Sequence, residues 1–384
     1  MKILYFAKDA PNVNSGYGKC CREICKRLKR LGHQVAVFAT IGNRAAYLSE
    51  IEGLLTYPGT DNIFGEDVIC DHAAHFGADV VITQMDIWPL TQIHEHSAMR
   101  KIVWVPYVPI DFDPLPEDSV LHKLRQASYV ISMCNWAGQE LTKHGIENTS
   151  IHHGIDIDTY RLLPNKKAEL KTELGFESDC YLIGMVMANQ LFRKAWVEQL
   201  QAVKQFIDQR KDKKIRLYIH TITNSSQGYD IVQLVRTLGL QEYVRFSDPY
   251  HMVLGYTEQR IARIYNTIDI LMSCTNGEGF GMPVNEAQGC GTPVIATNVM
   301  SFPELVKFGY LADVDYWDYA PNLLKKAVPS IPSMVSCLNK AIDTKWNNRE
   351  IQDIAHYFWN WDDIIMQKWA IALERVKEKI SSSC

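Results

Sequence analysis

Short hydrophobic runs alternate with amphipathic stretches of helical length along most of the chain. In the first half, such runs are bordered by helical or turn sequence, as expected of buried strands. Strands are predicted at Lys2–Phe6, Gln34–Phe38, Asp79–Thr83, Lys101–Val105 and Tyr129–Ser132. A basic helix is predicted at about Lys19–Leu31. Strands that alternate with helices predict a mostly parallel sheet covered on both faces.

The second half repeats this alternation after a linker at Leu163-Pro164-Asn165. Strands are predicted near Tyr181–Val186, Ile215–Ile219, Val244–Phe246, Ile268–Ser273 and Val294–Ala296, and helices near Val197–Asp208, Ile231–Leu238 and Glu258–Tyr265. We therefore predict two α/β domains, each a doubly wound, Rossmann-like sheet, with residues 1–162 in the first and 163–359 in the second. Ligands of such sheets bind at the carboxyl ends of the strands.

Near the end of the chain, Phe358–Glu374 is rich in aromatic residues at helical spacing. This pattern predicts one amphipathic helix whose rings pack against the protein rather than against a ligand.

Composition narrows the class of protein. The chain has 384 residues, 47% of them hydrophobic and 22% charged, which fits a soluble globular protein of two domains. Its net charge of −4 argues against a large nucleic-acid footprint. No apolar run has the length of a membrane span, and Met1–Ala7 is too short for an export core. Ten scattered cysteines predict reduced thiols and a cytoplasmic location.

The most informative chemistry lies between Glu278 and Glu286, two carboxylates that flank a glycine-rich turn. Pro283 suits the first turn of a helix, whose amides and dipole favour an anion. Carboxylates beside an anion site are poor anion ligands, so we expect them to accept protons from hydroxyl groups. A nucleotide sugar supplies the diphosphate, the ribose and the hexose that these groups would bind.

This run, with the following Gly-Thr-Pro-Val-Ile-Ala296, resembles the E-x7-E signature of family four of the retaining glycosyltransferases, which have the GT-B fold. The resemblance implies that Glu278 contacts the donor sugar and Glu286 the ribose. It implies that the helix at about 360–384 crosses back to the first domain. It also implies a donor-binding backbone formed by Gly279, Phe280, Gly281, Met282, Pro283 and Val284.

A second cluster, Asn189 to Lys194, follows the strand Tyr181–Val186. The family carries an Arg and a Lys here that neutralise the donor diphosphate. Lys194 matches the Lys, whereas Asn189 (or Ala188, depending on the gap) occupies the position of the Arg. We expect Arg193 to replace that Arg and Asn189 to contact the donor. Fixed cations would stabilise the leaving nucleoside diphosphate without a metal or another cofactor.

In the first domain, Gly16 and Gly18 fit the family's glycine loop, which approaches the donor through its backbone. The family's His after the strand Lys101–Val105 is missing, and Asp111 is the candidate for its role. Asp111 and Asp113 are alternatively a metal-binding pair, but such a pair belongs to a different glycosyltransferase fold. Asp86 is a candidate acceptor contact, and Ser247 a candidate contact of the nucleotide base.

We therefore expect a metal-independent, retaining glycosyltransferase that uses a UDP- or GDP-sugar and a hydroxyl acceptor. The alternatives are glycosylation of a modified nucleic-acid base, another GT-B activity such as a nucleotide-sugar epimerase, and a non-catalytic sugar-nucleotide-binding protein. The basic helix face, Lys19 to Arg30, leaves a peripheral membrane contact open as well.

Overall fold

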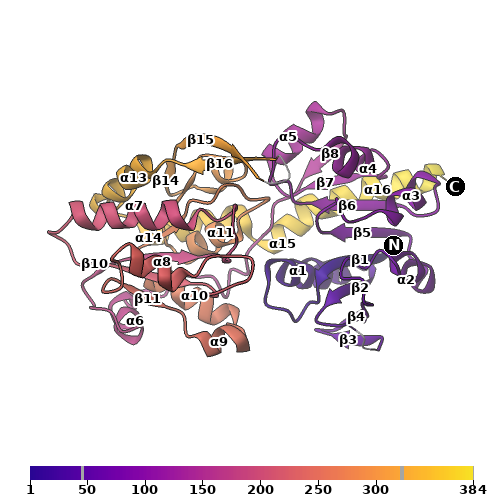
Figure 1. Cartoon of the computed structure of the whole chain (residues 1–384). Coiled ribbons are helices and arrows are strands. Elements are labelled where there is room, and N and C mark those ends of the chain that lie inside the picture. The colour runs from indigo at the N-terminus through magenta and orange to yellow at the C-terminus, as the bar shows by residue number, and fades with distance from the viewer. Residues whose placement is uncertain (45–46, 321–323, 384) are drawn as a thin grey trace. The chain divides into compact units, whose positions relative to one another are not determined.

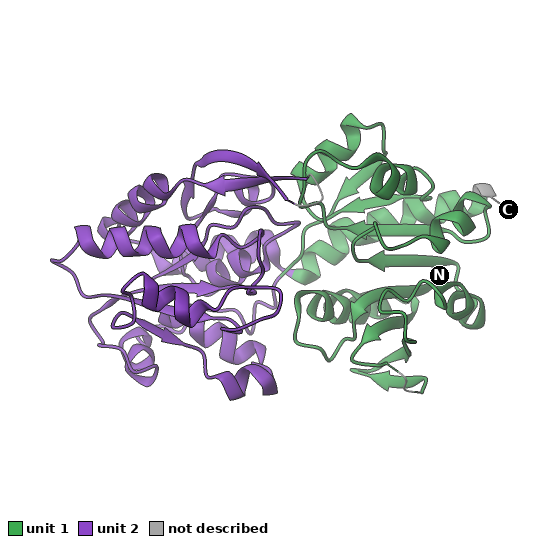
Figure 2. Cartoon of the chain, viewed as in Figure 1, with its two compact units in different colours: residues 1–154, 361–384 green, residues 155–360 purple. Residues whose placement is uncertain are grey.

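The computed structural model describes residues 1–44, 47–320 and 324–383. The chain divides into two compact units, residues 1–154 with 361–384 (unit 1) and residues 155–360 (unit 2), as Figure 2 shows. The sequence placed the boundary at 162/163. Residues 155–162 belong to unit 2 because they bind its last helix: the Ile155 amide donates to the Trp359 carbonyl (2.7 Å), and His356 Nε2 lies 2.8 Å from the Tyr160 carbonyl.

Unit 1 is built on an eight-stranded sheet in the order β3-β4-β2-β1-β5-β6-β7-β8, parallel except for the β3–β4 pair. Its central strands are buried over almost their whole length, which explains their continuous hydrophobic runs. The strands are β1 Lys2–Asp9, β2 Gln34–Ile41, β3 Ser49–Ile51, β4 Leu54–Tyr57, β5 Val80–Gln84, β6 Trp104–Val108, β7 Val130–Ser132 and β8 Asn148–Ser150.

The helices of unit 1 cover this sheet, and the C-terminal segment supplies three of its helical elements (Figure 1). In that segment Trp369 is fully buried, with its ring 5.1 Å from that of Tyr107. The helices are α1 Gly16–Arg30, α2 Ile69–Phe76, α3 Gln92–Ala98, η1 Glu117–Leu121, α4 His122–Leu124, α5 Asn135–Lys143, α15 Trp361–Ile364, the π-helical turn η2 Ile365–Trp369, and α16 Ala370–Ser383.

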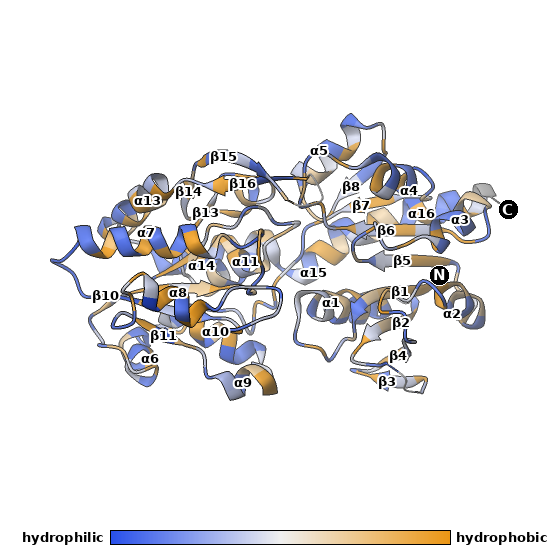
Figure 3. Cartoon of the chain, viewed as in Figure 1, coloured by the Kyte–Doolittle hydropathy of each residue, from blue (hydrophilic) through white to orange (hydrophobic). Residues whose placement is uncertain are grey.

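Unit 2 contains a six-stranded parallel sheet in the order β11-β10-β9-β12-β13-β14 and a separate antiparallel ribbon, β15–β16. Hydrophobic residues run along the strands, whereas α7 alternates hydrophobic and hydrophilic positions because only one side of it is buried (Figure 3). The strands are β9 Tyr181–Val186, β10 Ile215–His220, β11 Val244–Phe246, β12 Ile270–Ser273, β13 Val294–Thr297, β14 Gly309–Ala312, β15 Val314–Tyr319 and β16 Lys325–Pro329.

Helices of unit 2 follow most of its strands, as the predicted βα alternation requires. Its core includes side chains of β9, β10 and β12 packed with those of α7 and α13. The helices are α6 Lys167–Glu173, α7 Trp196–Gln209, α8 Ile231–Thr237, α9 Pro249–Leu254, α10 Glu258–Thr267, α11 Met282–Gly289, α12 Phe302–Leu305, α13 Ile331–Asp343 and α14 Asn348–Trp359.

The predicted helix Phe358–Glu374 is interrupted, which is a correction to the sequence analysis. The backbone of Asn360 is extended (φ −64°, ψ 122°) and forms an isolated parallel bridge with Ile155. The helix α14 therefore ends at Trp359, and α15 begins at Trp361 in the other unit.

Candidate functional site

The two predicted clusters of unit 2 lie at one edge of its sheet. The segment 187–195 follows β9, and 274–281 follows β12. These strands are parallel neighbours, so both segments leave the sheet at its carboxyl edge. This is the edge at which doubly wound sheets bind ligands.

Glu278 connects the two segments through ion pairs. The Lys194 ammonium donates to Glu278 Oε1, and Arg193 Nη2 donates to Glu278 Oε2 over 3.1 Å. The side chains of Lys194 and Glu278 are only 10% and 12% exposed, whereas that of Arg193 is 41% exposed. Two cations thus bind the same carboxylate.

The protonation of Glu278 follows from these neighbours. Burial raises the pKa of this carboxyl, but the charges of Lys194 and Arg193 outweigh burial, and the pKa lies below its usual range. Glu278 is therefore ionised at neutral pH and accepts hydrogen bonds only.

Asn276 holds the cation-bearing segment in place. Its backbone amide donates to the Arg193 carbonyl (2.9 Å), and its side-chain Nδ2 donates to the Phe192 carbonyl (3.1 Å). On the other side, Gln199 Nε2 donates to the Lys194 carbonyl (2.7 Å), while Gln199 Oε1 accepts from the Cys274 amide (2.9 Å). Arg193 and Lys194 therefore sit on a backbone that is fixed at several points.

The turn after Glu278 leads directly into α11. Gly281 has a φ of +107°, a conformation that favours glycine, and no side chain caps the helix that starts at Met282. Ser301 Oγ lies 3.2 Å from the Glu278 carbonyl and 2.5 Å from the Phe280 carbonyl, so it orients both. Gly279 and Phe280 are buried, whereas Gly281, Met282 and Pro283 are partly exposed and Val284 is buried.

Glu286 lies one turn into α11 and is buried. The Tyr265 hydroxyl donates to Glu286 Oε2 over 2.9 Å, and the carboxylate also interacts with Tyr160. Burial raises the pKa of both tyrosines, and the negative charge of Glu286 raises it further. Both hydroxyls therefore remain protonated and able to donate to this carboxylate.

Asn285, beside Glu286, was not singled out from the sequence. Its side chain is 1% exposed, and neither amide atom has a hydrogen-bond partner among the described residues. Burying an amide without hydrogen-bond partners lowers the stability of the folded protein. Asn285 is therefore a residue that is unfavourable for stability at this position. The sequence gives no signal of this, because Asn is common at exposed helix positions as well.

The structure gives Asn189 a different task from the one predicted. Both hydrogens of its side-chain amide are engaged, by the carbonyls of Ile222 (3.1 Å) and Tyr229 (2.6 Å), and its Oδ1 accepts from the Tyr229 amide (2.9 Å). Asn189 therefore ties the loop after β9 to the loop after β10. Its amide has no hydrogen left for a donor phosphate, so it does not stand in for the family's Arg.

Ser247 is likewise occupied by the protein. Its amide donates to the Ile219 carbonyl (2.9 Å) and its hydroxyl to the Thr221 carbonyl (3.4 Å), and the residue is buried. It follows β11 at the same carboxyl edge, and both its amide and its hydroxyl are engaged within the protein.

In unit 1, Gly16 and Gly18 form the first turn of α1 and are not a free loop. Ser15 caps the helix by accepting from the Gly18 amide (3.0 Å). A Cβ at Gly18 would lie 2.2 Å from the Val13 carbonyl oxygen, so glycine is needed there for packing. Gly16 is exposed at the start of the helix.

Asp111 and Asp113 follow β6 and are partly exposed, and Asp86 follows β5 with similar exposure. Within residues 1–44, 47–320 and 324–383, no three His, Cys, Asp or Glu side chains are grouped as metal ligands. Two histidines of unit 1, which could be considered as metal ligands, bind within the protein: His72 Nε2 lies 3.1 Å from the Pro58 carbonyl, and His75 Nδ1 lies 2.8 Å from the Tyr57 hydroxyl.

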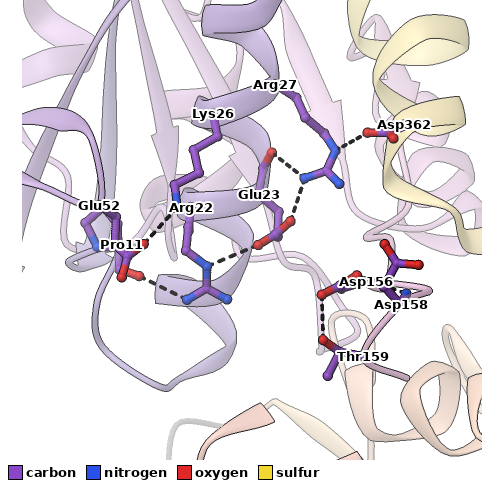
Figure 4. A network of polar contacts seen from close by, with 10 residues as sticks. All are labelled: Pro11, Arg22, Glu23, Lys26, Arg27, Glu52, Asp156, Asp158, Thr159 and Asp362. Carbon is purple, nitrogen blue, oxygen red and sulfur yellow. Dashed lines mark hydrogen bonds and ion pairs between the residues drawn. The ribbon is translucent and has the colours of Figure 1, made fainter. Parts of the chain in front are cut away.

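The basic face of α1 is largely used inside unit 1, as Figure 4 shows. Arg27 binds Glu23 and, from Nε, Asp362 (2.6 Å), while Lys26 binds Glu52 (2.8 Å). Further contacts are made by Arg22 with Glu23 and the Pro11 carbonyl, and by Lys29 with the Gly53 carbonyl. These partners reduce the positive charge that α1 offers to an anionic surface. No helix of the described residues is long and apolar enough to span a membrane.

Residues 169–324, which contain Lys194, Glu278 and Glu286, match the family model described as "Glycosyl transferases group 1". This segment is therefore similar to the group 1 glycosyltransferases. It lies within unit 2 and includes both predicted clusters and α11.

Curated proteins that are similar in sequence to this chain are also named as glycosyltransferases. D-inositol 3-phosphate glycosyltransferase 2 from Catenulispora acidiphila is 27% identical over 181 residues, which are 45% of this chain and 40% of the relative. D-inositol 3-phosphate glycosyltransferase from Mycobacterium marinum is 26% identical over 219 residues, 54% of this chain and 44% of the relative. The chain thus spans less than half the length of these two relatives.

Solved structures extend the similarity to both units. A glycosyltransferase from Rickettsia africae has a TM-score of 0.72 and 17% identity, and the match covers 97% of this chain and 98% of that one. Anabaena Alr3699/HepE, solved in complex with UDP-glucose, has a TM-score of 0.70 and 19% identity over 100% of both chains. These matches confirm the predicted GT-B fold of two Rossmann-like domains.

Proposed function

We propose that this chain is a retaining glycosyltransferase that moves a sugar from a UDP- or GDP-sugar to a hydroxyl acceptor. The observation that carries the proposal is the Lys194–Glu278–Arg193 cluster at the carboxyl edge of the sheet, in a segment similar to the group 1 glycosyltransferases. The names of the curated relatives, and the UDP-glucose held by a protein of the same fold, support the substrate class.

The positive charge of two side chains is the main support for the proposed transfer. In a transfer from a nucleotide sugar, the leaving diphosphate gains negative charge, which preorganised cations stabilise. Lys194 and Arg193 bring two positive charges to this edge of the sheet, where both bind Glu278. Arg193 is the more exposed of the two, so its guanidinium is able to turn from Glu278 to a phosphate.

The proposed reaction balances without a protein nucleophile. The bond between the sugar C1 and the β-phosphate oxygen breaks, and a bond between C1 and the acceptor oxygen forms on the same face of the sugar. The acceptor proton passes to the leaving phosphate oxygen. In this scheme Glu278 accepts from a sugar hydroxyl, Glu286 accepts from the ribose, and the backbone from Gly279 to Val284 lines the donor.

Unit 1 contributes one candidate side chain. Asp111 follows a strand of the parallel sheet and is partly exposed, so we propose that it contacts the sugar or the acceptor hydroxyl. Gly16 is an exposed backbone contact in the same proposal. The Gly18 amide is occupied by Ser15, and Gly18 therefore acts through packing.

Three other activities of this fold differ in their products. An epimerase would convert the sugar nucleotide without an acceptor, a base-modifying enzyme would need a nucleic acid, and a binding protein would turn over neither. We propose a cytoplasmic location, in keeping with the nine described cysteines, which are in the thiol form and not in disulfides. A peripheral membrane contact through α1 is the weaker proposal, because intramolecular ion pairs hold much of its charge.

The test begins with thermal shifts of the full chain in UDP-, GDP- and ADP-sugars. We expect one nucleotide series to raise the melting temperature, and NMR of the transfer product to show the anomeric configuration of the donor. Product of the opposite configuration would exclude retention. Binding without transfer or hydrolysis would favour the non-catalytic protein, and an epimerised sugar nucleotide would favour the epimerase.

A further inference from the structure

The β15–β16 ribbon of unit 2 carries exposed aromatic side chains that the proposed donor chemistry does not use. Tyr316, Trp317 and Tyr319 are 46–57% exposed, on a two-stranded ribbon outside the six-stranded sheet (Figure 1). The match to the family model includes β15 and ends just before β16 begins. The residues of the donor cluster, Arg193, Lys194, Glu278 and Glu286, lie outside the ribbon.

The ribbon rises from the same edge of the sheet as the donor cluster. It follows β14, which is parallel to β13, and β13 is parallel to β12. The carboxyl ends of these strands meet at one edge, so β15 starts on the side where Glu278 and Arg193 lie.

Two contacts tie the ribbon to the cation-bearing segment. The Ala327 amide donates to the carbonyl of Asn276 (3.2 Å), the residue whose amides hold Phe192 and Arg193. Beside it, the Lys326 ammonium lies 5.1 Å from the centre of the Phe192 ring. Phe192 is itself 52% exposed and immediately precedes Arg193.

The strand register separates the ribbon into two faces. Asp318 pairs with Lys326, and their side chains form an ion pair (3.3 Å). Because side chains alternate along a strand, Tyr316 lies on the face of Asp318 and Lys326, and Trp317 and Tyr319 lie on the opposite face. The first face joins two exposed rings, those of Tyr316 and Phe192, to a carboxylate and an ammonium.

This mixture of groups fits a sugar better than other ligands. A sugar ring packs its C–H face on an aromatic ring and offers hydroxyls that both donate and accept hydrogen bonds. On this face the carboxylate of Asp318 and the ammonium of Lys326 form an ion pair, so their charges balance. A balanced face favours a neutral ligand over nucleic acids and anionic lipid surfaces.

We propose that the acceptor is a carbohydrate, and that Tyr316, Asp318, Lys326 and Phe192 hold one of its sugar rings beside Arg193. The ring stacks on the aromatic side chains while its hydroxyls bind Asp318 and Lys326. This assignment rests on the proposed transferase function and narrows its acceptor class.

Affinity electrophoresis of the full chain tests the surface without any need for turnover. The native gels contain dextran, glycogen, hydroxyethyl cellulose or xylan, and the variants are Tyr316→Ala, Phe192→Ala and the control Tyr319→Ala. The control removes the same side chain, at nearly the same exposure (57% against 56%), from the other face of the same ribbon. Thermal melts verify that all three variants fold, and UDP binding is measured in parallel.

We expect the wild type to be retarded by at least one of these polysaccharides. Each ring removed from the proposed face should weaken that binding by up to about tenfold, and Tyr319→Ala should leave it unchanged. No retardation of the wild type, or equal losses for Tyr316→Ala and Tyr319→Ala, would overturn the proposal. Loss of polysaccharide binding should leave UDP binding intact. Absence of UDP binding in the wild type would instead count against the transferase function, whatever the gels show.

Discussion

The Lys194 ammonium is bound to the Glu278 carboxylate although both side chains are nearly buried. The pair holds the loop after β9 against the loop after β12. It places one of the two proposed phosphate-binding cations where water cannot screen it well, and a cation in such a site acts more strongly on a developing charge. Because the ion pair is buried, its loss should affect the stability of the fold as well as the proposed catalysis.

The substitution Lys194→Ala is therefore expected to lower both the rate of transfer and the stability of the fold. Removing one preorganised cation should lower kcat by about 10²–10³-fold. It should also lower the free energy of unfolding, by up to about 3–5 kcal/mol, because Glu278 then keeps only the half-exposed Arg193. Urea unfolding and transfer kinetics measure the two effects separately.

The double variant Lys194→Met/Glu278→Gln is the matched control, since it leaves no buried charge unpaired. We expect it to recover most of the lost stability and none of the lost activity. Recovered activity would show that Lys194 acts only through folding.

Glu286→Gln should weaken nucleotide binding and leave the fold intact. The amide oxygen still accepts from Tyr265, but the ribose loses a charged acceptor, which corresponds to about 1.5–3 kcal/mol. Calorimetry with the nucleoside diphosphate measures this loss. Tyr265→Phe is the control for packing, and equal affinity of Glu286→Gln and the wild type would remove Glu286 from the donor site.

Activity should survive exhaustive chelation, because Lys194, Arg193 and the N-terminus of α11 supply the positive charge that a metal would bring. Transfer is assayed in EDTA and after the addition of manganese or magnesium. Activity that vanishes and returns with the metal would indicate that Asp111 and Asp113 are metal ligands.

If activity is retained, the variant Asp111→Asn separates the remaining roles of Asp111. Loss of rate alone would place Asp111 at the acceptor hydroxyl, and loss of donor affinity would place it at the donor sugar.

His153 makes unit 1 sensitive to acid. Burial lowers the pKa of this imidazole to about 3, and its Nδ1 lies 2.8 Å from the Tyr107 hydroxyl. Between pH 6.5 and 3, the unfolded chain therefore takes up a proton that the folded chain does not. The free energy of unfolding should fall by up to about 1.4 kcal/mol per pH unit in that window, and this destabilisation is absent above it. Urea titrations at successive pH values should show a shallower fall for His153→Gln, and parallel curves would contradict this origin.

Asn285→Leu should stabilise the protein by about 1–3 kcal/mol, since it removes two buried polar atoms without partners. The side chains are similar in volume, so little repacking is needed. Thermal and urea unfolding measure the gain. Donor affinity is measured in the same variant, and a fall in affinity together with higher stability would place the Asn285 amide in the donor pocket.

Local pattern was sufficient for the parts of the fold that depend on nearby residues. The strands Tyr181–Val186 and Val244–Phe246 were predicted with the bounds that the structure gives them. The first is a continuous hydrophobic run between turns, as expected of a buried parallel strand. The strand predicted at Lys101–Val105 instead begins at Trp104, since the preceding residues are turn. Also missed were β3, β4, β8, β14 and the β15–β16 ribbon, which are short, polar or rich in aspartate.

Features decided by distant residues could not be predicted. The bonds of Asn189 run to residues 33 and 40 positions away, and the break at Asn360 depends on pairing with Ile155. Within the candidate site, the motif predicted which residues gather at the sheet edge, and Glu278, Arg193 and Lys194 do meet there. The pairing of both cations with Glu278, and the clamp at Asn276, required the three-dimensional arrangement.

The chain enters unit 2 after Gly154 and leaves it after Asn360, so unit 1 is assembled from two separated stretches of sequence. Synthesis proceeds from the N-terminus, and domains generally fold as units. Unit 2 is continuous and is complete once residue 360 has left the ribosome. Unit 1 is begun first, yet it lacks the buried Trp361 and Trp369 until the last segment emerges. During translation, unit 2 is therefore complete before unit 1, although unit 1 is begun earlier.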